Sequence, residues 1–291
     1  MKKIIVLLTF LFCQALCFAD QLIIEPDQGR APLLSFIDHA KSNITLVTYG
    51  LTDSAFIDAL EKAKHEGKSV DVMLEPSPYR AANENQFAIA NLHKDGIEVK
   101  KPNPEFKFLH QKTFLIDDYA IIMTFNLTHS TFKNERNFAL ILQDPLLVKK
   151  IRANLPDDRL VWSPDNSREK ITDFIRSAHD SIKIYAQNVA DYKIIGELAH
   201  AARKGVDVKI LTSNKLSPKK LHYLTKAGVQ VQLNHHLYIH AKVILIDEKR
   251  ALLGSINLTQ TSLDKNRELS IITDKPEIIR ILNETFTRDF L

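Results

Sequence analysis

Two short stretches of the chain carry the same three ionisable side chains at the same spacing. The first reads HQKTFLID and runs from His110 to Asp117, and the second reads HAKVILID and runs from His240 to Asp247. Histidine can act as nucleophile, acid or base near neutral pH, and lysine provides a positive charge that binds anions. At about 5% usage per residue type, such a triple arises by chance in roughly one start in ten thousand. Two copies therefore indicate one shared chemistry on an anionic group.

Each motif lies on an apolar run that predicts a β-strand. Side chains two residues apart on a strand share a face, so each histidine points the same way as the lysine after it, Lys112 or Lys242. Asp117 and Asp247 are an odd number of residues from the histidines, at the strand ends. We expect these two carboxylates to fix a turn or to pair a neighbouring charge, and not to contact a substrate.

The motifs belong to a repeat that covers most of the chain. Residues 33–117 match residues 170–247 in the same order of events, and Asn-Leu-Thr follows each motif, at Asn126 and at Asn257. The period is far longer than that of a solenoid unit, so the sequence indicates a duplicated domain.

Breaker residues, among them Pro156 and Pro164, gather between positions 154 and 166 and place the seam of the repeat there. We therefore expect three segments, namely a signal peptide at 1–19, a first domain at 20–155 and a second domain at 156–291.

Each half alternates helical and extended patterns. In the first half, helices are predicted at 33–40, 56–63 and 83–93, and strands at 44–49, 70–74, 97–100, 113–116 and 120–123. Strands that alternate with helices predict a sheet covered on both faces. We expect two tandem α/β domains related by a pseudo-twofold axis. Each would have a mixed, largely parallel sheet flanked by helices, with an antiparallel pair at the motif.

In the second half, the asparagine after the motif belongs to the run Gly254-Ser255-Ile256-Asn257. His-x-Lys-x-x-x-x-Asp followed by Gly-Ser-x-Asn resembles the phospholipase D superfamily, and the resemblance spans nearly all of the chain after residue 19. It implies two phospholipase D-like domains and a double displacement on phosphorus. One neutral imidazole would attack the phosphodiester to form a phosphohistidine. A second imidazole would protonate the leaving oxygen and then activate water.

By this resemblance, His110 would be the nucleophile and His240 the acid. The lysines and asparagines would stabilise charge on the non-bridging oxygens, so no metal and no cofactor is expected. The implied catalytic set is His110, Lys112, Asn126, His240, Lys242, Ser255, Asn257 and Glu268. The implied supporting residues are Asp117, Thr124, Glu135 and Asp247.

The first half departs from the pattern of the superfamily. Thr124-Phe125-Asn126 stands where the second half has Gly-Ser-x-Asn, and the asparagine comes one residue sooner after the histidine. Glu268 lies where the family places the carboxylate that orients the histidine, so it should accept a hydrogen bond from His240. The matching position in the first half is Asn137. Glu135 could share its face, which leaves open whether His110 has an orienting carboxylate.

The start of the chain predicts export. Lys2 and Lys3 precede an apolar run that ends at Ala19, which is typical of a cleaved secretory signal peptide. Both cysteines, Cys13 and Cys17, lie within this segment, so we expect a mature protein without disulfides, secreted or periplasmic and of bacterial origin. The formal net charge of +4 is mild for a protein that coats nucleic acid.

The interpretation is a secreted, metal-independent phosphodiester hydrolase of phospholipase D type that cleaves phospholipid head groups. The principal alternative is an endonuclease that hydrolyses DNA or RNA by the same mechanism, because the halves are compact and Lys-rich pairs such as Lys100-Lys101 could contact a backbone. A phosphatidyltransferase and a non-catalytic binding module are further alternatives. The expected partner is a phospholipid or nucleic-acid substrate. We expect a monomer with pseudo-dimeric domains that contacts a membrane peripherally.

Overall fold

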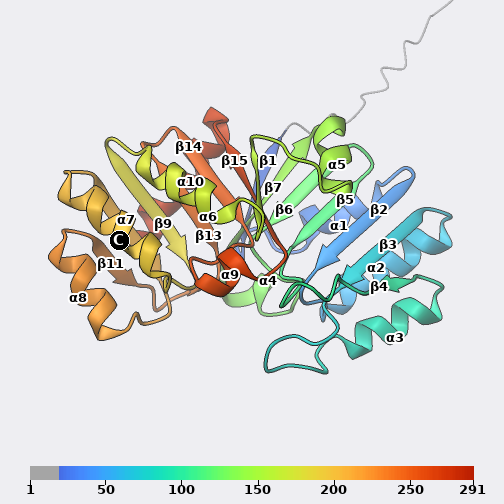
Figure 1. The fold of residues 1–291 in the computed structure, drawn as a ribbon. Coiled ribbons are helices and arrows are strands. Elements are labelled where there is room, and N and C mark those ends of the chain that lie inside the picture. The colour runs from blue at the N-terminus through green and yellow to red at the C-terminus, as the bar shows by residue number, and fades with distance from the viewer. Residues whose placement is uncertain (1–19) are drawn as a thin grey trace, which may run out of the picture.

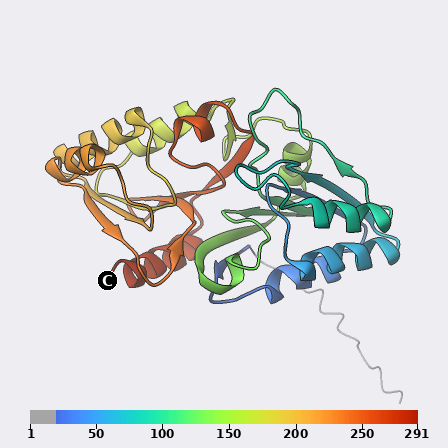
Figure 2. The same cartoon turned by 90° about the horizontal axis from the view of Figure 1, so that it is seen from below.

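The computed structural model describes residues 20–291, and the predicted signal peptide lies outside them. Two sheets stand side by side, one in each half of the chain. Helices lie on the outer face of each sheet, and the helices at 145–152 and 276–290 contribute to the core between the sheets (Figures 1 and 2). The helices are α1 (Ala31–Asp38), α2 (Ser54–His65), α3 (Gln86–Lys94), α4 (Thr131–Asn134), α5 (Pro145–Arg152), α6 (Ser167–Arg176), α7 (Tyr192–Arg203), α8 (Pro218–Lys226), α9 (Gln260–Asp264) and α10 (Pro276–Phe290).

The first sheet has the order β1-β7-β6-β5-β2-β3-β4. Its strands are β1 (Gln21–Glu25), β2 (Asn43–Thr48), β3 (Ser69–Leu74), β4 (Val99–Lys100), β5 (Thr113–Ile116), β6 (Tyr119–Met123) and β7 (Glu135–Gln143). The second sheet repeats this order as β8-β15-β14-β13-β9-β10-β11. Its strands are β8 (Leu160–Ser163), β9 (Ser181–Ala186), β10 (Asp207–Thr212), β11 (Gln230–Leu233), β13 (Lys242–Ile246), β14 (Arg250–Gly254) and β15 (Glu268–Thr273). The pseudo-twofold arrangement of α/β domains predicted from the repeat is therefore confirmed.

Both sheets are mixed, as the sequence predicts, but antiparallel pairing extends beyond the one pair expected at the motif. In the first sheet, β2, β3 and β4 are parallel, whereas β2, β5, β6, β7 and β1 follow one another in antiparallel pairs. The reason is that β5 and β6 are joined by a tight turn at 117–118 and that the chain reverses again over residues 124–134 to enter β7. The helical crossovers at α2 and α3 return the chain in parallel. "Largely parallel" thus describes only one edge of each sheet.

Three clusters of buried apolar side chains hold the layers together. One packs α1, α2 and α3 on the first sheet, and another packs α6, α7 and α8 on the second. The remaining cluster joins the two sheets, and it includes Phe138, Tyr185 and Phe286 together with buried residues of α5 and α10. The two halves therefore share a core, which fixes their relative position. Within residues 20–291, no helix is long and apolar enough to cross a membrane.

Candidate active site

Each motif histidine is held by the backbone of the opposite half. The amide of His110 donates to the carbonyl of Arg267 (2.9 Å), and the amide of Arg267 donates to the carbonyl of Phe108 (2.9 Å). On the other side, β12 (Tyr238–Ile239) pairs with β7 in parallel, and the amides of His240 and Ala241 both donate to the carbonyl of Arg136 (3.3 and 3.0 Å). In each half, the backbone next to the motif histidine therefore pairs with a segment of the other half, and we call each of these two pairings a crossing.

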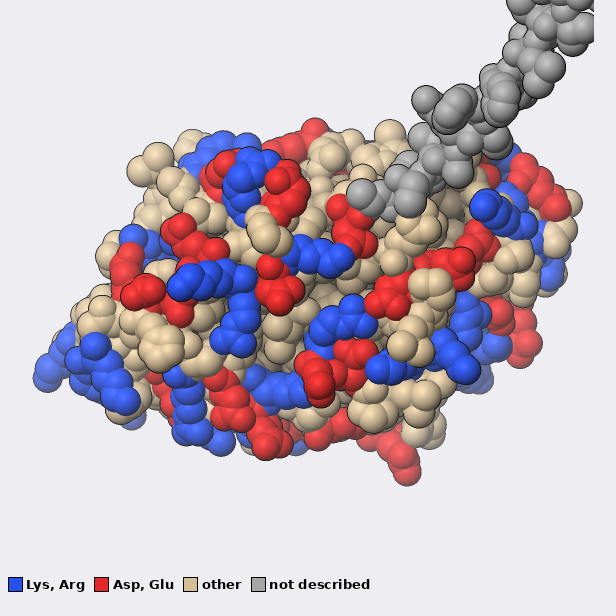
Figure 3. Space-filling model, turned by 90° about the horizontal axis from the view of Figure 1, so that it is seen from above, with Lys and Arg blue, Asp and Glu red and all other residues tan. Residues whose placement is uncertain are grey.

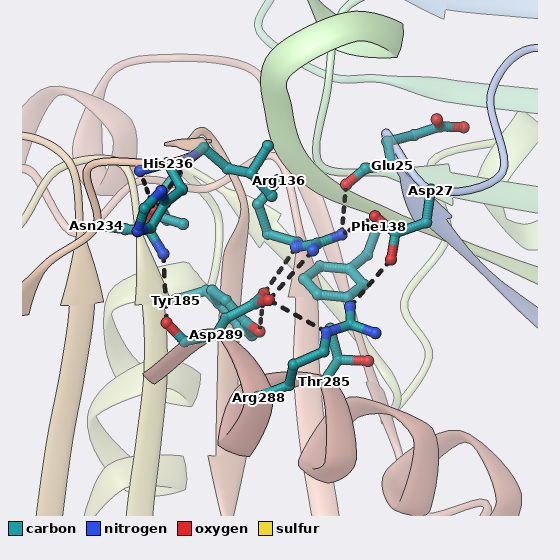
Figure 4. Close-up of polar contacts among 12 residues, drawn as sticks. Glu25, Asp27, Arg136, Phe138, Tyr185, Asn234, His236, Thr285, Arg288 and Asp289 are labelled. Atoms are coloured by element: carbon teal, nitrogen blue, oxygen red, sulfur yellow. Dashed lines mark hydrogen bonds and ion pairs between the residues drawn. The ribbon is translucent and has the colours of Figure 1, made fainter. Parts of the chain in front are cut away.

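The second crossing rests on a buried arginine network, which Figure 4 shows. The Arg136 guanidinium donates to Asp289 from Nε (2.7 Å), and to Asp27 and the Glu25 carbonyl from Nη1 (2.8 and 2.9 Å). Asp289 also accepts from the Tyr185 hydroxyl (2.7 Å). Strand β7 is thereby tied to the C-terminal end of α10, which lies in the other half.

Glu268 contacts His110, and the predicted contact of Glu268 with His240 is wrong. The Nδ1 atom of His110 lies 2.8 Å from Oε2 of Glu268, which is fully buried and accepts from Asn266 through its other oxygen (3.0 Å). The physical reason is the crossing, because pairing of Leu109 with Arg267 brings the next residues of these segments face to face. His110 therefore has an orienting carboxylate, and it comes from the other half.

His240 is oriented by an amide. Its Nδ1 lies 3.1 Å from Oδ1 of Asn137, the position that matches Glu268 in the repeat. Thr124 donates to the same amide oxygen (2.9 Å), and the amide nitrogen of Asn137 donates to Glu135 (3.1 Å). Glu135 is 4.0 Å from His240 Nδ1, so the carboxylate considered for His110 stands beside His240. In His110, the carboxylate at Nδ1 requires Nδ1 to carry the proton and leaves Nε2 as the acceptor. In His240, Nζ of Lys242 lies 3.2 Å from Nδ1 and 3.3 Å from Nε2, so this ring is also contacted by its own motif lysine.

The two motif lysines are almost completely buried, at 1% exposure for Lys112 and 5% for Lys242. Lys112 donates to the His110 carbonyl (2.8 Å), and Lys242 donates to the carbonyls of His240 and Thr124. Burial lowers the pKa of Lys112 to about 7. Burial, reinforced by the charge of Lys112, lowers the pKa of Lys242 well below its usual range. The positive charges of Lys112 and Lys242 are therefore not fully balanced by carboxylates within the site.

Burial and the nearby charges also shift the pKa values of the two histidines. Burial lowers the pKa of His110, and the Glu268 carboxylate opposes that shift. Burial and then the charges of Lys242, Lys112 and His110 lower the pKa of His240 well below its ordinary value. Burial alone would raise the pKa of Glu268, but His110 and Lys112 together lower it. Both imidazoles are thus favoured as neutral rings, and Glu268 is favoured as a carboxylate.

Asn126 and Asn257 lie at matching places behind the lysines. The amide oxygen of each is buried and has no hydrogen-bond partner among residues 20–291. Gly50 makes room for Asn126, because a Cβ at position 50 would come within 3.2 Å of the asparagine side chain. A buried acceptor without a protein partner is available to a donor group on a ligand. A non-bridging phosphate oxygen is itself an acceptor, so the predicted contacts of these side chains would use their amide nitrogens, and they remain a prediction.

The two hydroxyl side chains that precede these asparagines brace neighbouring strands. Ser255 accepts from the Leu269 amide (3.2 Å), and Thr124 accepts from the Phe138 amide (2.9 Å). Both hydroxyl residues are fully buried. The proposed catalytic part of Ser255 therefore remains a prediction, whereas its structural contact is defined.

The motif aspartates lie away from the histidines, at the turns where the sequence places them. Asp117 accepts from the amides of Lys41, Ser42 and Asn43 (2.6 to 3.1 Å). Asp247 accepts from the amides of residues 179–181 in the same manner. Both aspartates have positive φ, 49° and 53°. The second turn contains one more residue than the first, which explains the one-residue difference in spacing to the asparagines.

Aromatic rings that the motifs do not include border His110. The Tyr49 ring makes an edge contact with the His110 ring at 4.9 Å between centroids, and Lys112 Nζ lies 5.2 Å from the Tyr49 centroid. Phe108 packs against Tyr49 and against the exposed Tyr79, both at 6.2 Å. Position 49 is glutamine in the second half, Gln187. This side of the site is therefore aromatic. The sequence indicates Phe108, which directly precedes the first motif, whereas Tyr49 is found only by comparing the repeats.

The family model described as "Cardiolipin synthase, PLD-like domain" matches residues 33–159 and again residues 171–290. The chain therefore belongs to the phospholipase D superfamily, as the doubled motif predicts. Among residues 20–291, no three His, Cys, Asp or Glu side chains are grouped in a way that could hold a metal ion.

Individual relatives differ in the reaction that their names state. A phospholipase D of Rickettsia bellii is 34% identical over 119 residues, which cover 40% of this chain and 59% of the relative. Cardiolipin synthase B of Salmonella typhimurium is 23% identical over 313 aligned positions, which cover 87% and 75%. A phosphatidylserine synthase structure from Haemophilus influenzae superposes with a TM-score of 0.70 at 13% identity, over 93% of this chain and 86% of that one, and shows the fold alone. The first relative is thus matched over less than two thirds of its length.

Proposed function

We propose that the protein hydrolyses phosphodiesters through a covalent phosphohistidine, with phospholipid as the substrate. The observation that carries the proposal is the crossed pairing at the site, in which Glu268 of one half orients His110 of the other at 2.8 Å. A ring whose Nδ1–H is held by a carboxylate presents a more basic Nε2 lone pair than a ring held by an amide. This difference favours His110 as the nucleophile and His240 as its partner.

In the first step, Nε2 of His110 attacks phosphorus and the bond to the leaving oxygen breaks. Protonated His240 gives its proton to that oxygen, so the alcohol leaves neutral. In the second step, neutral His240 removes a proton from water, and the water oxygen attacks the phosphohistidine. The phosphorus–nitrogen bond then breaks, and both rings return to their initial state. Lys112, Lys242 and the two asparagines stabilise the charge on the non-bridging oxygens.

The depressed pKa values are consistent with this cycle when the substrate is included. The empty site holds Lys112, Lys242 and two imidazoles around few carboxylates, so each protonation disfavours the next. A phosphodiester brings one negative charge among them and reverses the sign of that field. We therefore expect substrate binding to raise the pKa of His240, which supplies the proton that the leaving group requires.

Several features favour a lipid substrate. The names of the matching family and of the relatives above refer to phospholipid chemistry. Exposed Tyr79, which packs on Phe108 beside His110, and partly exposed Tyr238 before His240 place amphipathic rings at the site, as suits a membrane interface. On the face in Figure 3, basic and acidic side chains are interspersed and do not form the continuous basic stripe typical of nucleic-acid binding.

The proposal includes export and action as a monomer. Both His-Lys-Asn sets lie in one chain, and each histidine contacts an orienting side chain from the opposite half, so no second copy is required. Asp20, which directly follows the predicted cleavage site, is tied into the fold through the Gln143 amide (2.9 Å). Cell fractionation and N-terminal sequencing test export, and a mature protein that retains residues 1–19 would contradict it.

The substrate is tested with one panel of assays in the presence of chelator. Purified protein is offered vesicles of phosphatidylcholine, vesicles containing cardiolipin, single-stranded DNA and RNA. We expect release of lipid head groups without added metal, and loss of this activity in His240→Ala. His236→Ala, which removes an exposed histidine four residues away, is the matched control and should retain activity.

Each other outcome has a defined meaning. Cleavage of nucleic acid alone would replace the lipid proposal with the endonuclease. Loss of all activity in chelator would contradict the metal-independent mechanism. Transfer of the phosphatidyl group to added glycerol in preference to water would assign the protein to the transferases.

A further inference from the structure

The two halves differ in the helix that follows β7 in the first half and β15 in the second. Helix α5 has 8 residues and α10 has 15, although both begin with a proline at the same place in the repeat (Figure 1). Arg152, the last residue of α5, donates to Thr45 on β2 (3.2 Å). At the equivalent place, Asn283 of α10 accepts from Lys183 on β9. The helices therefore match up to this point, and only α10 continues.

The continuation of α10 covers the inner face of the second sheet. Phe286 packs edge-on against Tyr185 at 5.0 Å between ring centroids, and Asp289 accepts from the Tyr185 hydroxyl. In the first sheet, Val47 stands where the second has Tyr185, and the chain turns away after α5 at Asn154, whose φ is 52°. A hollow of about 360 Å³ occupies the place of the missing turns.

The hollow combines an apolar floor with a positively charged rim. Its floor includes Val47, Met73, Leu109, Leu115, Phe106 and Ile151. Its charged residues are Asp71, Lys100, Arg152 and Arg267, so cations outnumber anions. Lys100 is paired with Asp71 (2.6 Å), and Arg267 is paired with Asp165 (2.8 Å). Arg152 donates to the neutral side chains of Thr45 and Asn43, and these contacts leave its charge unneutralised.

We propose that this hollow binds a single-chain amphiphile with an anionic head group, such as a fatty acid or an alkyl phosphate. The alkyl chain fills the space that Tyr185 and Phe286 occupy in the second half, and the head group pairs with Arg152 at the rim. Such a site is separate from the catalytic one. Leu109 and Gln111 line the hollow, whereas His110 between them faces Glu268 on the other side of the strand.

Binding is measured by isothermal titration calorimetry on the full chain, below the micelle concentration of each probe. The probes are dodecyl phosphate, dodecanoate, dodecyl maltoside and inorganic phosphate. We expect both anionic amphiphiles to bind with one-to-one stoichiometry. The neutral maltoside should bind about tenfold more weakly, the size expected for one charge-assisted hydrogen bond. Equal affinity for the maltoside, or binding of inorganic phosphate as tight as that of dodecyl phosphate, would overturn the proposal.

Variants locate the site. Val47→Tyr introduces the residue of the second half and should abolish binding of dodecyl phosphate by filling the hollow. Arg152→Gln leaves the hollow open and should weaken only the anionic probes, again about tenfold. Lys149→Gln, on an exposed turn of the same helix, removes the same charge elsewhere and should change nothing.

The catalytic site must be excluded as the place where the phosphate probe binds. Lys242→Ala should leave binding of dodecanoate and dodecyl phosphate unchanged. Binding that survives Val47→Tyr and Arg152→Gln but disappears in Lys242→Ala would contradict the proposal, because the probe would then occupy the catalytic site. If Val47→Tyr does not fold, as judged by circular dichroism, Arg152→Gln and Lys149→Gln still decide the outcome.

Discussion

The two histidines occupy equivalent positions in the repeat, but they differ in the side chain that holds Nδ1. His110 is held by the Glu268 carboxylate, whereas His240 is held by the Asn137 amide. A carboxylate stabilises positive charge on the ring and an amide does so far less. The repeat thus gives a symmetric frame, and a single difference between glutamate and asparagine distinguishes the side chains that contact the two rings.

The frame also makes the halves interdependent. His110 depends on Glu268 from the second half, and His240 depends on Asn137 and the Arg136 carbonyl from the first. A single half would contain a histidine without its orienting partner. The comparison between the two rings can therefore be tested by changing either the rings or the residues that cross to them.

The largest expected effect is the loss of kcat when either histidine is removed. The two histidines are distinguished by a substrate whose leaving group needs no proton. His110→Ala should lose at least about 10⁴-fold in kcat on every substrate, because the nucleophile is absent. His240→Ala should lose about 10² to 10⁴-fold on a lipid. It should lose far less in the first, covalent step with bis-p-nitrophenyl phosphate, whose leaving group needs no proton. A rapid-mixing assay of nitrophenolate release measures this, and rescue of His110→Ala in place of His240→Ala would reverse the roles.

The next largest effect concerns the two arginines at the crossings. Arg136 is paired with buried Asp289, whereas Arg267 is paired with Asp165, whose side chain is 56% exposed. Arg136→Met should lower the free energy of unfolding by about 3 kcal/mol, because buried Asp289 would lose both hydrogen bonds from the guanidinium and keep only the Tyr185 hydroxyl and Arg288 at 3.6 Å. Arg267→Met should cost less, about 1 kcal/mol, because its partner Asp165 is exposed and stays hydrated when the arginine is removed. Urea denaturation measures both, and equal losses would show that the crossings are energetically alike.

Exchanging the orienting groups sharpens the comparison directly. Glu268→Gln retains an acceptor for His110 but removes its charge, so kcat should fall on the order of 100-fold, about 2.7 kcal/mol. Asn137→Asp adds a carboxylate beside His240 and should raise the pKa of that ring, with a smaller effect on kcat. Steady-state kinetics across pH measure both. A larger loss of kcat in Asn137→Asp than in Glu268→Gln would contradict this expectation, because activity would then depend more on the group that holds His240 than on the group that holds His110.

A smaller effect should appear in the pH dependence of the native protein. Lys112 has a pKa of about 7 in the empty site, so it carries its charge below that pH and loses it above. The alkaline limb of kcat/KM, which reports the free protein, should therefore fall from about pH 7. The limb of kcat should lie at higher pH, because bound phosphodiester raises the lysine pKa. If kcat/KM and kcat fell at the same alkaline pH, the proposed effect of the bound phosphodiester on the lysine pKa would be contradicted.

The sequence predicted the frame of the site but not its partners. The doubled motif indicated His110, Lys112, His240 and Lys242, because their spacing is local to one short segment of chain. Lys242 begins β13, whereas His110, Lys112 and His240 precede the strands on which the sequence placed them. It assigned Glu268 to His240, since sequence order cannot reveal that the chain crosses between halves before each motif. Strand β1 was not predicted, because it begins directly after the signal-like segment and is short. The hollow beside Val47 follows from the missing turns of α5, which no motif records.

The central claim is that His110 is the nucleophile and that it depends on a carboxylate from the other half. The most direct measurement is mass spectrometry of the protein quenched during turnover with bis-p-nitrophenyl phosphate. We expect a p-nitrophenylphosphoryl group on His110, because release of one nitrophenolate leaves the other on phosphorus. Its steady-state amount should be higher in His240→Ala, because hydrolysis of the adduct then lacks its base. A phosphate adduct at His240, or none under conditions where nitrophenolate is released in a burst, would contradict the account.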